Sequence, residues 1–122
     1  MMEKIETENA PKAIGPYSQA VAAGGFVFVS GQLPTNPHGT ITEQTTQVLN
    51  NLAAILKAAN LSLSDVVRCE VFLKDLSDFH VMNTIYADHF SQPIKPARQT
   101  IQVANLPLNS KIEISCIARK KP

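Results

Sequence analysis

The stretch PARQTIQVANLPLNSKIEI, residues 96–114, contains two predicted β-strands joined by a short connection. Each strand carries a charged residue where a strand buried on both faces would not, Arg98 in the first and Glu113 in the second. A strand that is buried on both faces is usually a near-continuous apolar run. The two strands are therefore predicted to lie in a sheet with one apolar face and one semi-polar face. Because their connection is short, they are also predicted to run in opposite directions.

The alternation of side chains predicts the face on which each charge lies. If the apolar residues point toward covering helices, Ile101 and Val103 do so, and Arg98 and Glu113 lie together on the opposite face. At about 3.3 Å per residue, the two charges differ by roughly 13 Å in height along the strands. Within one chain they are not expected to touch, so a shared site would take them from different subunits. The alternative is that both are unrelated, solvated surface charges.

The remaining pattern predicts two strand–helix–strand units. Thr40 followed by Glu43 forms a capping box that predicts a helix beginning at residue 41, and its apolar periodicity ends near Asn60. The other predicted elements are a strand over 24–34, a strand over 66–75 and a helix over 78–90. The order is β-β-α-β-α-β-β. This order favours an α+β fold in which both helices cover one face of a mixed sheet.

The composition predicts an ordinary globular domain spanning residues 1–122. A net charge of +1 provides no strong field for attracting nucleic acid or an anionic membrane, and the basic residues 119–121 are interpreted as a solvated tail. The N-terminus lacks the apolar segment of a signal peptide, and no apolar run approaches the roughly 18 residues needed to cross a bilayer. A cytoplasmic protein is therefore expected.

Metal and redox chemistry have little support in the sequence. Cys69 and Cys116 each lie within a strand-like run and are predicted to be buried, reduced thiols. The three histidines, His38, His80 and His89, have no metal-ligand spacing with the cysteines or with one another. No metal site is predicted.

Several blocks of the chain resemble the RidA family, also called YjgF or endoribonuclease L-PSP. They are ENAPKAIGPYSQAV (8–21), FVFVSGQLP (26–34), VFLKDLSDFHVMNTIYADHF (71–90) and the stretch 96–114. The resemblance implies a chorismate-mutase-like fold. It also implies a homotrimer with its sheets packed inward and clefts between subunits. The implied activity is cofactor-independent hydrolysis of 2-imino acids, such as 2-iminopropanoate and 2-iminobutanoate, to 2-keto acids and ammonia.

The resemblance also implies roles for individual residues. Arg98 matches the arginine that binds the substrate carboxylate, for which its planar, bidentate guanidinium is suited. Glu113 matches the glutamate that orients water and moves protons, and Tyr17 matches a tyrosine whose hydroxyl lines the cleft. The implied substrate-binding positions are Arg98, Ser30, Gly31, Asn83 and Thr100. Simpler readings remain open: Tyr17 as a packed ring, Gly31 as a turn residue and Asn83 as a solvated helix position.

Two positions depart from the family pattern. Thr100 stands where many relatives carry cysteine, which speaks against covalent or redox chemistry but leaves a backbone contact with the ligand open. Gln99 stands where the family usually has a small residue, and this can narrow the cleft. Two other functions remain as alternatives: a 2-keto-acid-binding sensor or interaction module, and an endoribonuclease or translation inhibitor. The near-neutral charge and sparse basic residues disfavour RNA as a partner.

Overall fold

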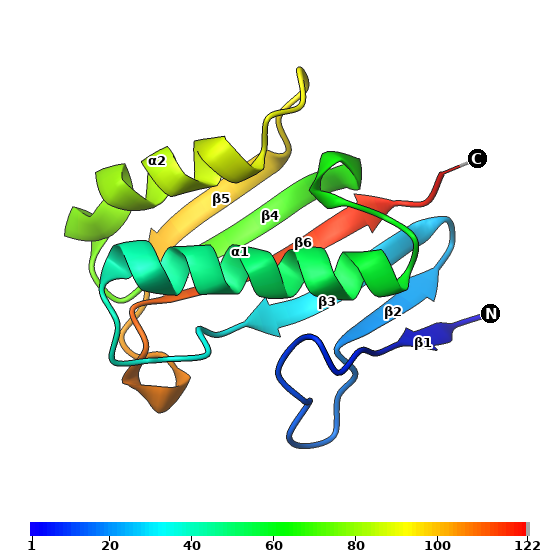
Figure 1. Ribbon diagram of the computed structural model, residues 1–122, viewed down its shortest axis with the longest axis horizontal. Coiled ribbons are helices and arrows are strands. Elements are labelled where there is room, and N and C mark those ends of the chain that lie inside the picture. The colour runs from blue at the N-terminus through cyan, green and yellow to red at the C-terminus, as the bar shows by residue number, and fades with distance from the viewer. Residues whose placement is uncertain (122) are drawn as a thin grey trace.

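The computed structural model describes residues 1–121 and shows a six-stranded sheet with two α-helices (Figure 1). The order of elements confirms the predicted α+β class, with one additional short strand at the start. The strands are β1 (Glu3–Ile5), β2 (Ala20–Ala23), β3 (Phe26–Gln32), β4 (Val66–Leu73), β5 (Ala97–Gln102) and β6 (Ile112–Arg119). The helices are α1 (Ile41–Ala58) and α2 (Phe79–His89), and short 3₁₀ turns cover Leu63–Asp65, Leu76–Asp78 and Pro107–Asn109.

The sheet is mixed because its last strand enters the middle. Its spatial order is β1-β2-β3-β6-β4-β5, and β6 is antiparallel to both β3 and β4. β5 pairs only with β4, in parallel, after the chain crosses through α2. The final two strands therefore run in opposite directions, as predicted, but β4 separates them. β5 is consequently an edge strand.

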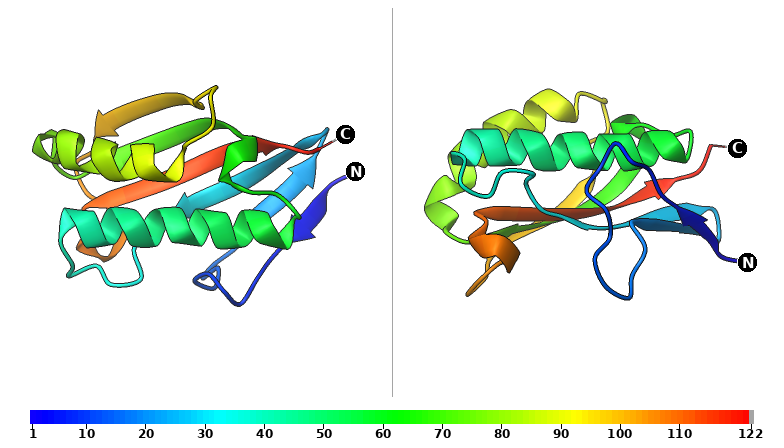
Figure 2. Two further views of the ribbon diagram at one scale, coloured as in Figure 1. Left: turned by 45° about the horizontal axis from the view of Figure 1, so that its top comes forward. Right: turned by 60° about the horizontal axis from the view of Figure 1, so that its bottom comes forward.

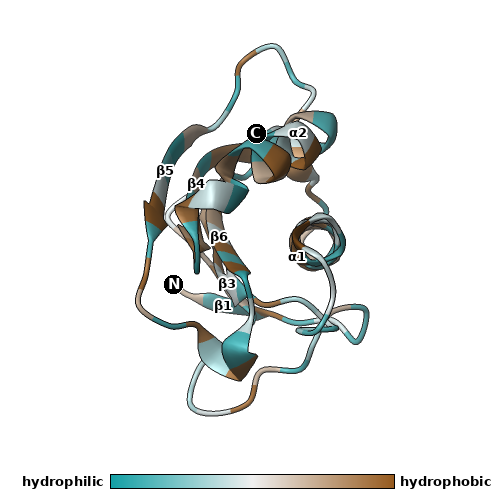
Figure 3. Cartoon of the chain, turned by 90° about the vertical axis from the view of Figure 1, so that its left-hand side faces the viewer, coloured by the Kyte–Doolittle hydropathy of each residue, from teal (hydrophilic) through white to brown (hydrophobic). Residues whose placement is uncertain are grey.

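Both helices lie on the same side of the sheet (Figures 2 and 3). The capping box is present at the start of α1: Thr40 Oγ1 accepts from the Glu43 amide at 3.1 Å, and Glu43 Oε1 accepts from the Thr40 amide at 2.9 Å. α1 ends where Asn60 adopts a positive φ of 62°. The core fills the space between the helices and the sheet. Its largest fully buried side chains include Phe90, Leu49, Leu52, Ile55, Leu56, Leu73, Met82, Ile112 and Ile114.

The two cysteines are buried, free thiols, as predicted. Cys69 of β4 and Cys116 of β6 lie directly opposite one another on the helix-covered face. Burial raises the pKa of the Cys69 thiol to about 11, and burial also raises the pKa of Cys116. Both therefore stay protonated at neutral pH, so they act as small apolar core residues.

The opposite face of the sheet is not covered by any helix. Phe26 and Phe28 of β3 are 40% and 42% exposed there, and Ile101 of β5 is 38% exposed. This face also carries Glu113 and Phe72, which are register partners on β6 and β4. It is the semi-polar face that the sequence predicted, and we call it the open face. Among residues 1–121, no helix is long and apolar enough to cross a membrane.

Candidate functional site

Arg98 does not lie on the open face, which corrects the orientation predicted for β5. In the parallel ladder Arg98 pairs with Cys69 and Thr100 pairs with Val71, and both β4 partners are fully buried beneath the helices. Paired residues of neighbouring strands project to the same side of a sheet. Arg98 and Thr100 therefore point toward α2, whereas Ile101 points to the open face.

Three side chains of α2 hold the Arg98 guanidinium in place. Its Nη1 donates a hydrogen bond to Asn83 Oδ1 at 2.7 Å. Its Cζ lies 4.8 Å from the ring centroid of Tyr86 and 5.6 Å from that of Phe79. Such contacts are typical of a cation stacked on aromatic faces. Within residues 1–121 no carboxylate forms an ion pair with Arg98, so its charge is available to a ligand.

An open concavity of about 540 Å³ lies over this guanidinium. Its lining comes from α2, from the segment after it and from β5: Asn83, Tyr86, Ala87, Phe90, Lys95, Pro96 and Arg98. Most of these side chains are apolar or aromatic, and Arg98 and Lys95 are cations. Lys95 Nζ already donates to the carbonyls of Phe90 and Gln92 at 2.7 and 2.9 Å. Arg98 is therefore the cation best placed to receive a small carboxylate.

Glu113 lies on the open face, above a glycine of the neighbouring strand. A β-bulge at Ser30–Gly31 interrupts the pairing of β3 with β6 between Val29 and Gln32. A Cβ atom at Gly31 would lie only 2.6 Å from Glu113 Oε2. The absence of a side chain at Gly31 is thus what lets the Glu113 carboxylate occupy its position. Burial raises the pKa of Glu113, a direction that suits a group that must hold and release a proton near neutral pH.

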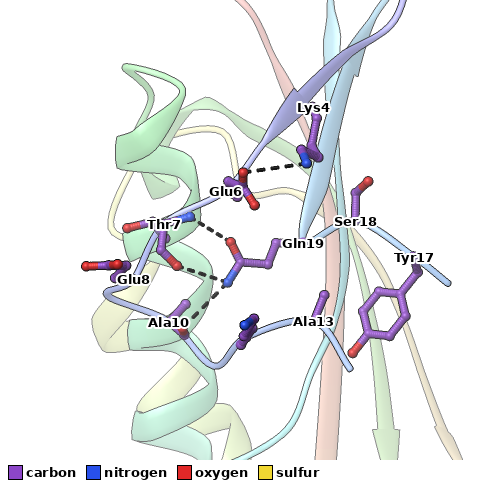
Figure 4. A pocket seen from close by; sticks show the side chains of 10 residues that line it. Lys4, Glu6, Thr7, Glu8, Ala10, Ala13, Tyr17, Ser18 and Gln19 are labelled. Atoms are coloured by element: carbon purple, nitrogen blue, oxygen red, sulfur yellow. Dashed lines mark hydrogen bonds and ion pairs between the residues drawn. The ribbon is translucent and has the colours of Figure 1, made fainter. Parts of the chain in front are cut away.

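Tyr17 lies in the N-terminal loop, residues 7–18, and the end of this loop contacts Ser30 of β3. Ser30 Oγ donates to the Ser18 carbonyl at 2.6 Å, and the Ser30 amide donates to the Gln19 carbonyl at 2.9 Å. Tyr17 is 54% exposed, and its hydroxyl accepts a weak hydrogen bond from the Ile14 amide at 3.4 Å. Tyr17 also lines a second concavity of about 770 Å³ inside the loop (Figure 4).

The candidate residues therefore form two groups within one chain. Arg98, Asn83 and Thr100 lie on the helix-covered face, and we call them the arginine group. The glutamate group, on the open face and the adjoining loop, consists of Tyr17, Ser30, Gly31 and Glu113. No hydrogen bond or ion pair joins the two groups in the part of the chain that the structure describes. Each group taken alone is an incomplete site.

The structure adds residues for which the sequence predicted no functional role. Phe79 and Tyr86 lie within the helix predicted over 78–90, and they form the aromatic surface against Arg98. Their spacing with Asn83, at i, i+4 and i+7, is the signal that could have indicated one shared helix face. Gln19, not predicted at all, is a buried side chain that anchors the N-terminal loop. Its amide contacts the backbone of Thr7, Ala10 and Pro11 through four hydrogen bonds. The bonds to Thr7 and Ala10 are drawn in Figure 4.

The comparison with known proteins agrees with this architecture. The family model described as Endoribonuclease L-PSP matches residues 7–120. The chain belongs to the endoribonuclease L-PSP family. Three similar proteins illustrate the range of the family. A RutC family protein of Pyrococcus horikoshii is 51% identical over 99% of this chain and 100% of its own length. The 2-iminobutanoate/2-iminopropanoate deaminase of Escherichia coli K12 is 43% identical over 99% of this chain and 100% of its own length.

The structural comparison gives the same family fold. The crystal structure of yeast Mmf1 matches with a TM-score of 0.94 and 42% identity, covering 99% of this chain and 100% of that chain. Of the two relatives described above, the E. coli protein has a deaminase name, whereas the P. horikoshii protein has only a general family name. Among the described residues of this L-PSP family member, no group of three His, Cys, Asp or Glu side chains is arranged to hold a metal ion.

Proposed function

We propose that this protein is a deaminase that hydrolyses reactive 2-imino acids to 2-keto acids and ammonia. The observation that carries the proposal is the Arg98 guanidinium, which no carboxylate of residues 1–121 pairs with and which Asn83 holds over a largely apolar concavity. The planar guanidinium of arginine, with its paired N–H donors, is suited to binding a small carboxylate bidentately. The 43% identity to an E. coli deaminase over 99% of the chain supports the reaction class.

The complete site is proposed to lie between subunits. The arginine group of one chain faces the glutamate group of a neighbour, in a homotrimer whose open faces pack toward the centre. The exposed Phe26, Phe28 and Ile101 of the open face support such packing, because large apolar side chains exposed on a sheet face are typical of interfaces. Within one chain, Arg98 and Glu113 lie on opposite faces of the sheet, so a neighbour is needed to bring them together.

The proposed reaction needs binding, water positioning and proton transfer. Arg98, with Asn83 beside it, binds the carboxylate of the protonated imine. Glu113 of the neighbour takes a proton from water as its oxygen bonds to the imine carbon, which gives a carbinolamine. Glu113 returns that proton to the nitrogen. It then takes the hydroxyl proton as the C–N bond breaks, ammonia departs and the C=O bond forms. Such acid–base help is worth about 10²–10⁴ in rate.

The other members of the two groups have supporting roles in this proposal. Tyr17 and Ser30 line the water side of the site, and Gly31 gives the ligand and Glu113 close access to the backbone. Thr100 contributes through its backbone, and its side-chain oxygen is buried without a hydrogen bond. The fold itself supplies no phosphate-binding loop or metal cluster in the described residues, and the proposed steps use none.

The experiment is a coupled assay in which a dehydratase supplies fresh 2-iminobutanoate or 2-iminopropanoate. Wild-type protein should accelerate keto-acid release, and Arg98→Ala should lower kcat/KM by about 100-fold through loss of a bidentate charged contact. Arg119→Ala, an exposed arginine at the end of β6, is the matched control and should keep full activity. Wild-type protein that binds 2-ketobutyrate without accelerating release would instead indicate a sensor.

A mixing experiment tests whether the site is shared between subunits. Arg98→Ala and Glu113→Gln proteins are each expected to retain only about 1% or less of wild-type activity. When they are unfolded, mixed equally and refolded together, about a quarter of the sites should receive both native residues from different chains. Activity near a quarter of wild type would support the intersubunit site. A mixture that remains as inactive as its components would contradict it.

A further inference from the structure

We infer that Tyr86 is a positioning residue for Arg98: its ring fixes the guanidinium in the orientation that receives the substrate carboxylate. This inference deepens the proposed function and rests on it for its catalytic part. Arg98 extends from an edge strand, and its Cζ lies 4.8 Å from the Tyr86 ring centroid. The hydrogen bond to Asn83 fixes only one nitrogen of the fork. The ring contacts the guanidinium at its central carbon and so restrains the group as a whole.

The surroundings of Tyr86 keep its ring from moving. Tyr86 is 7% exposed, and its ring centroid lies 4.4 Å from that of Phe90, which is fully buried. The Tyr86 ring is therefore packed between Phe90 of the core and the Arg98 guanidinium. Phe79, about two turns earlier on α2, approaches the same guanidinium at 5.6 Å and closes a second side. An arginine on an edge strand would otherwise sample many rotamers, and ordering it on ligand binding would reduce affinity.

The phenolic hydroxyl of Tyr86 has no part in this role. It is buried and has no hydrogen-bond partner among the described residues. Burial, and then the nearby Cys69 thiol, raise the pKa of Tyr86 far above its usual value, so the group remains a neutral phenol. Its hydroxyl therefore neither shares a proton with substrate nor orients Arg98. The inference assigns the function of this residue to the ring alone.

The substrate carboxylate carries the same charge before and during the reaction at the neighbouring carbon. A contact that only orients Arg98 therefore supports ground state and transition state alike, and its loss raises KM more than it lowers kcat. A cation–π contact of this kind is worth about two- to thirty-fold in binding. Tyr86→Leu should raise KM, and the inhibition constant of 2-ketobutyrate, by a factor in that range. Tyr86→Phe should stay within about twofold of wild type for both constants.

The test combines these kinetics with a measurement that needs no activity. The chain has three arginines, so its Nε–H signals in a ¹⁵N-labelled protein can be assigned by comparison with Arg98→Ala. The Arg98 signal should be displaced by the ring current of Tyr86 in wild type and Tyr86→Phe, and should lose that displacement in Tyr86→Leu. If the wild type proves inactive, the proposed function fails, but this signal still tests the positioning role.

Two further variants separate positioning from folding. Leu56→Ala removes a buried side chain of α1 that does not line the concavity, so it should lower stability while leaving KM unchanged. Phe79→Leu is milder because Phe79 is only half-buried, and it should raise KM in the same direction if Tyr86→Leu does not fold. The inference is overturned if Tyr86→Phe loses as much as Tyr86→Leu. It is equally overturned if folded Tyr86→Leu, or Phe79→Leu in its place, retains the wild-type KM and Arg98 signal.

Discussion

Replacing Gly31 by alanine should disable Glu113 while leaving the fold intact. The added Cβ would lie 2.6 Å from Glu113 Oε2, 2.8 Å from its Cδ and 3.1 Å from its Cγ. All three contacts are with the outer part of a flexible side chain, so the carboxylate gives way before the backbone does. Gly31 does not have a positive φ, so alanine introduces no backbone strain at this position.

The size of the displacement sets the expected effect. Reaching an ordinary contact of 3.4 Å requires Oε2 to move by about 0.8 Å, and a misplacement near 1 Å can cost about 100-fold in rate. We expect kcat/KM to fall by about 10- to 100-fold in the imine assay. Stability should change by less than about 1 kcal/mol, because alanine restricts the unfolded chain and partly offsets the side-chain rearrangement.

The assay compares Gly31→Ala with Glu113→Ala and with the double variant, alongside thermal unfolding of each. If the glycine acts only by making room for the carboxylate, Gly31→Ala should cause no further loss once Glu113 is already alanine. Gly39→Ala, whose Cβ would come nearest to the Glu43 side chain and the Asn36 carbonyl at 3.3–3.5 Å, is the control and should retain full activity. Full activity of Gly31→Ala, or an equal loss in both backgrounds, would refute the reasoning.

Three other predictions concern stability and reactivity. Gln19→Ala removes four hydrogen bonds to the N-terminal loop, so unfolding free energy should fall by about 1–3 kcal/mol and limited proteolysis within residues 7–18 should accelerate. An unchanged cleavage pattern would contradict this. Burial raises the pKa of Glu113 above its ordinary value of 4.5, so the folded chain holds that proton to higher pH than the unfolded chain. The free energy of unfolding should therefore fall as pH rises from the ordinary pKa of 4.5 through the raised pKa of the folded chain. Glu113→Gln should remove this fall when the free energy of unfolding is measured against pH. The same pH dependence in wild type and Glu113→Gln would be inconsistent with this prediction. Cys69 and Cys116 should react with a thiol reagent only after denaturation, and rapid labelling of the native protein would disprove their burial.

Local signals in the sequence were sufficient for the two helices and for the order along the chain of the strands from β2 onward. The start of α1 followed from Thr40 and Glu43, because a capping box satisfies backbone groups within four residues and needs no tertiary information. The alternation over 66–75 likewise identified β4, since a strand covered on one face buries every second residue. The short β1 was not predicted, because its three residues are too few to establish a period.

The orientation of β5 was predicted wrongly because an edge strand does not follow the rule for a half-buried strand. No residue of β5 is fully buried, so the apolar Ile101 and the charged Arg98 compete for two half-exposed faces. The parallel register with β4 and the aromatic side chains of α2 decide the outcome, and both are tertiary features. The stem of arginine packs well against apolar surface while its charged end finds a partner, here Asn83.

That orientation has a consequence for the chemistry of the proposed site. An arginine and a glutamate adjacent on one face of a single chain would form an ion pair, which would lower the pKa of the carboxyl group and occupy the guanidinium. With the two residues on opposite faces, no described carboxylate of the chain pairs with Arg98, and burial raises the pKa of Glu113 instead. In an intersubunit site, the carboxylate of a bound substrate would neutralise Arg98 as Glu113 comes near, so the glutamate keeps its affinity for a proton while substrate is present. Dividing the two groups between the faces of one sheet would therefore keep Arg98 and Glu113 in the ionisation states that the proposed reaction needs.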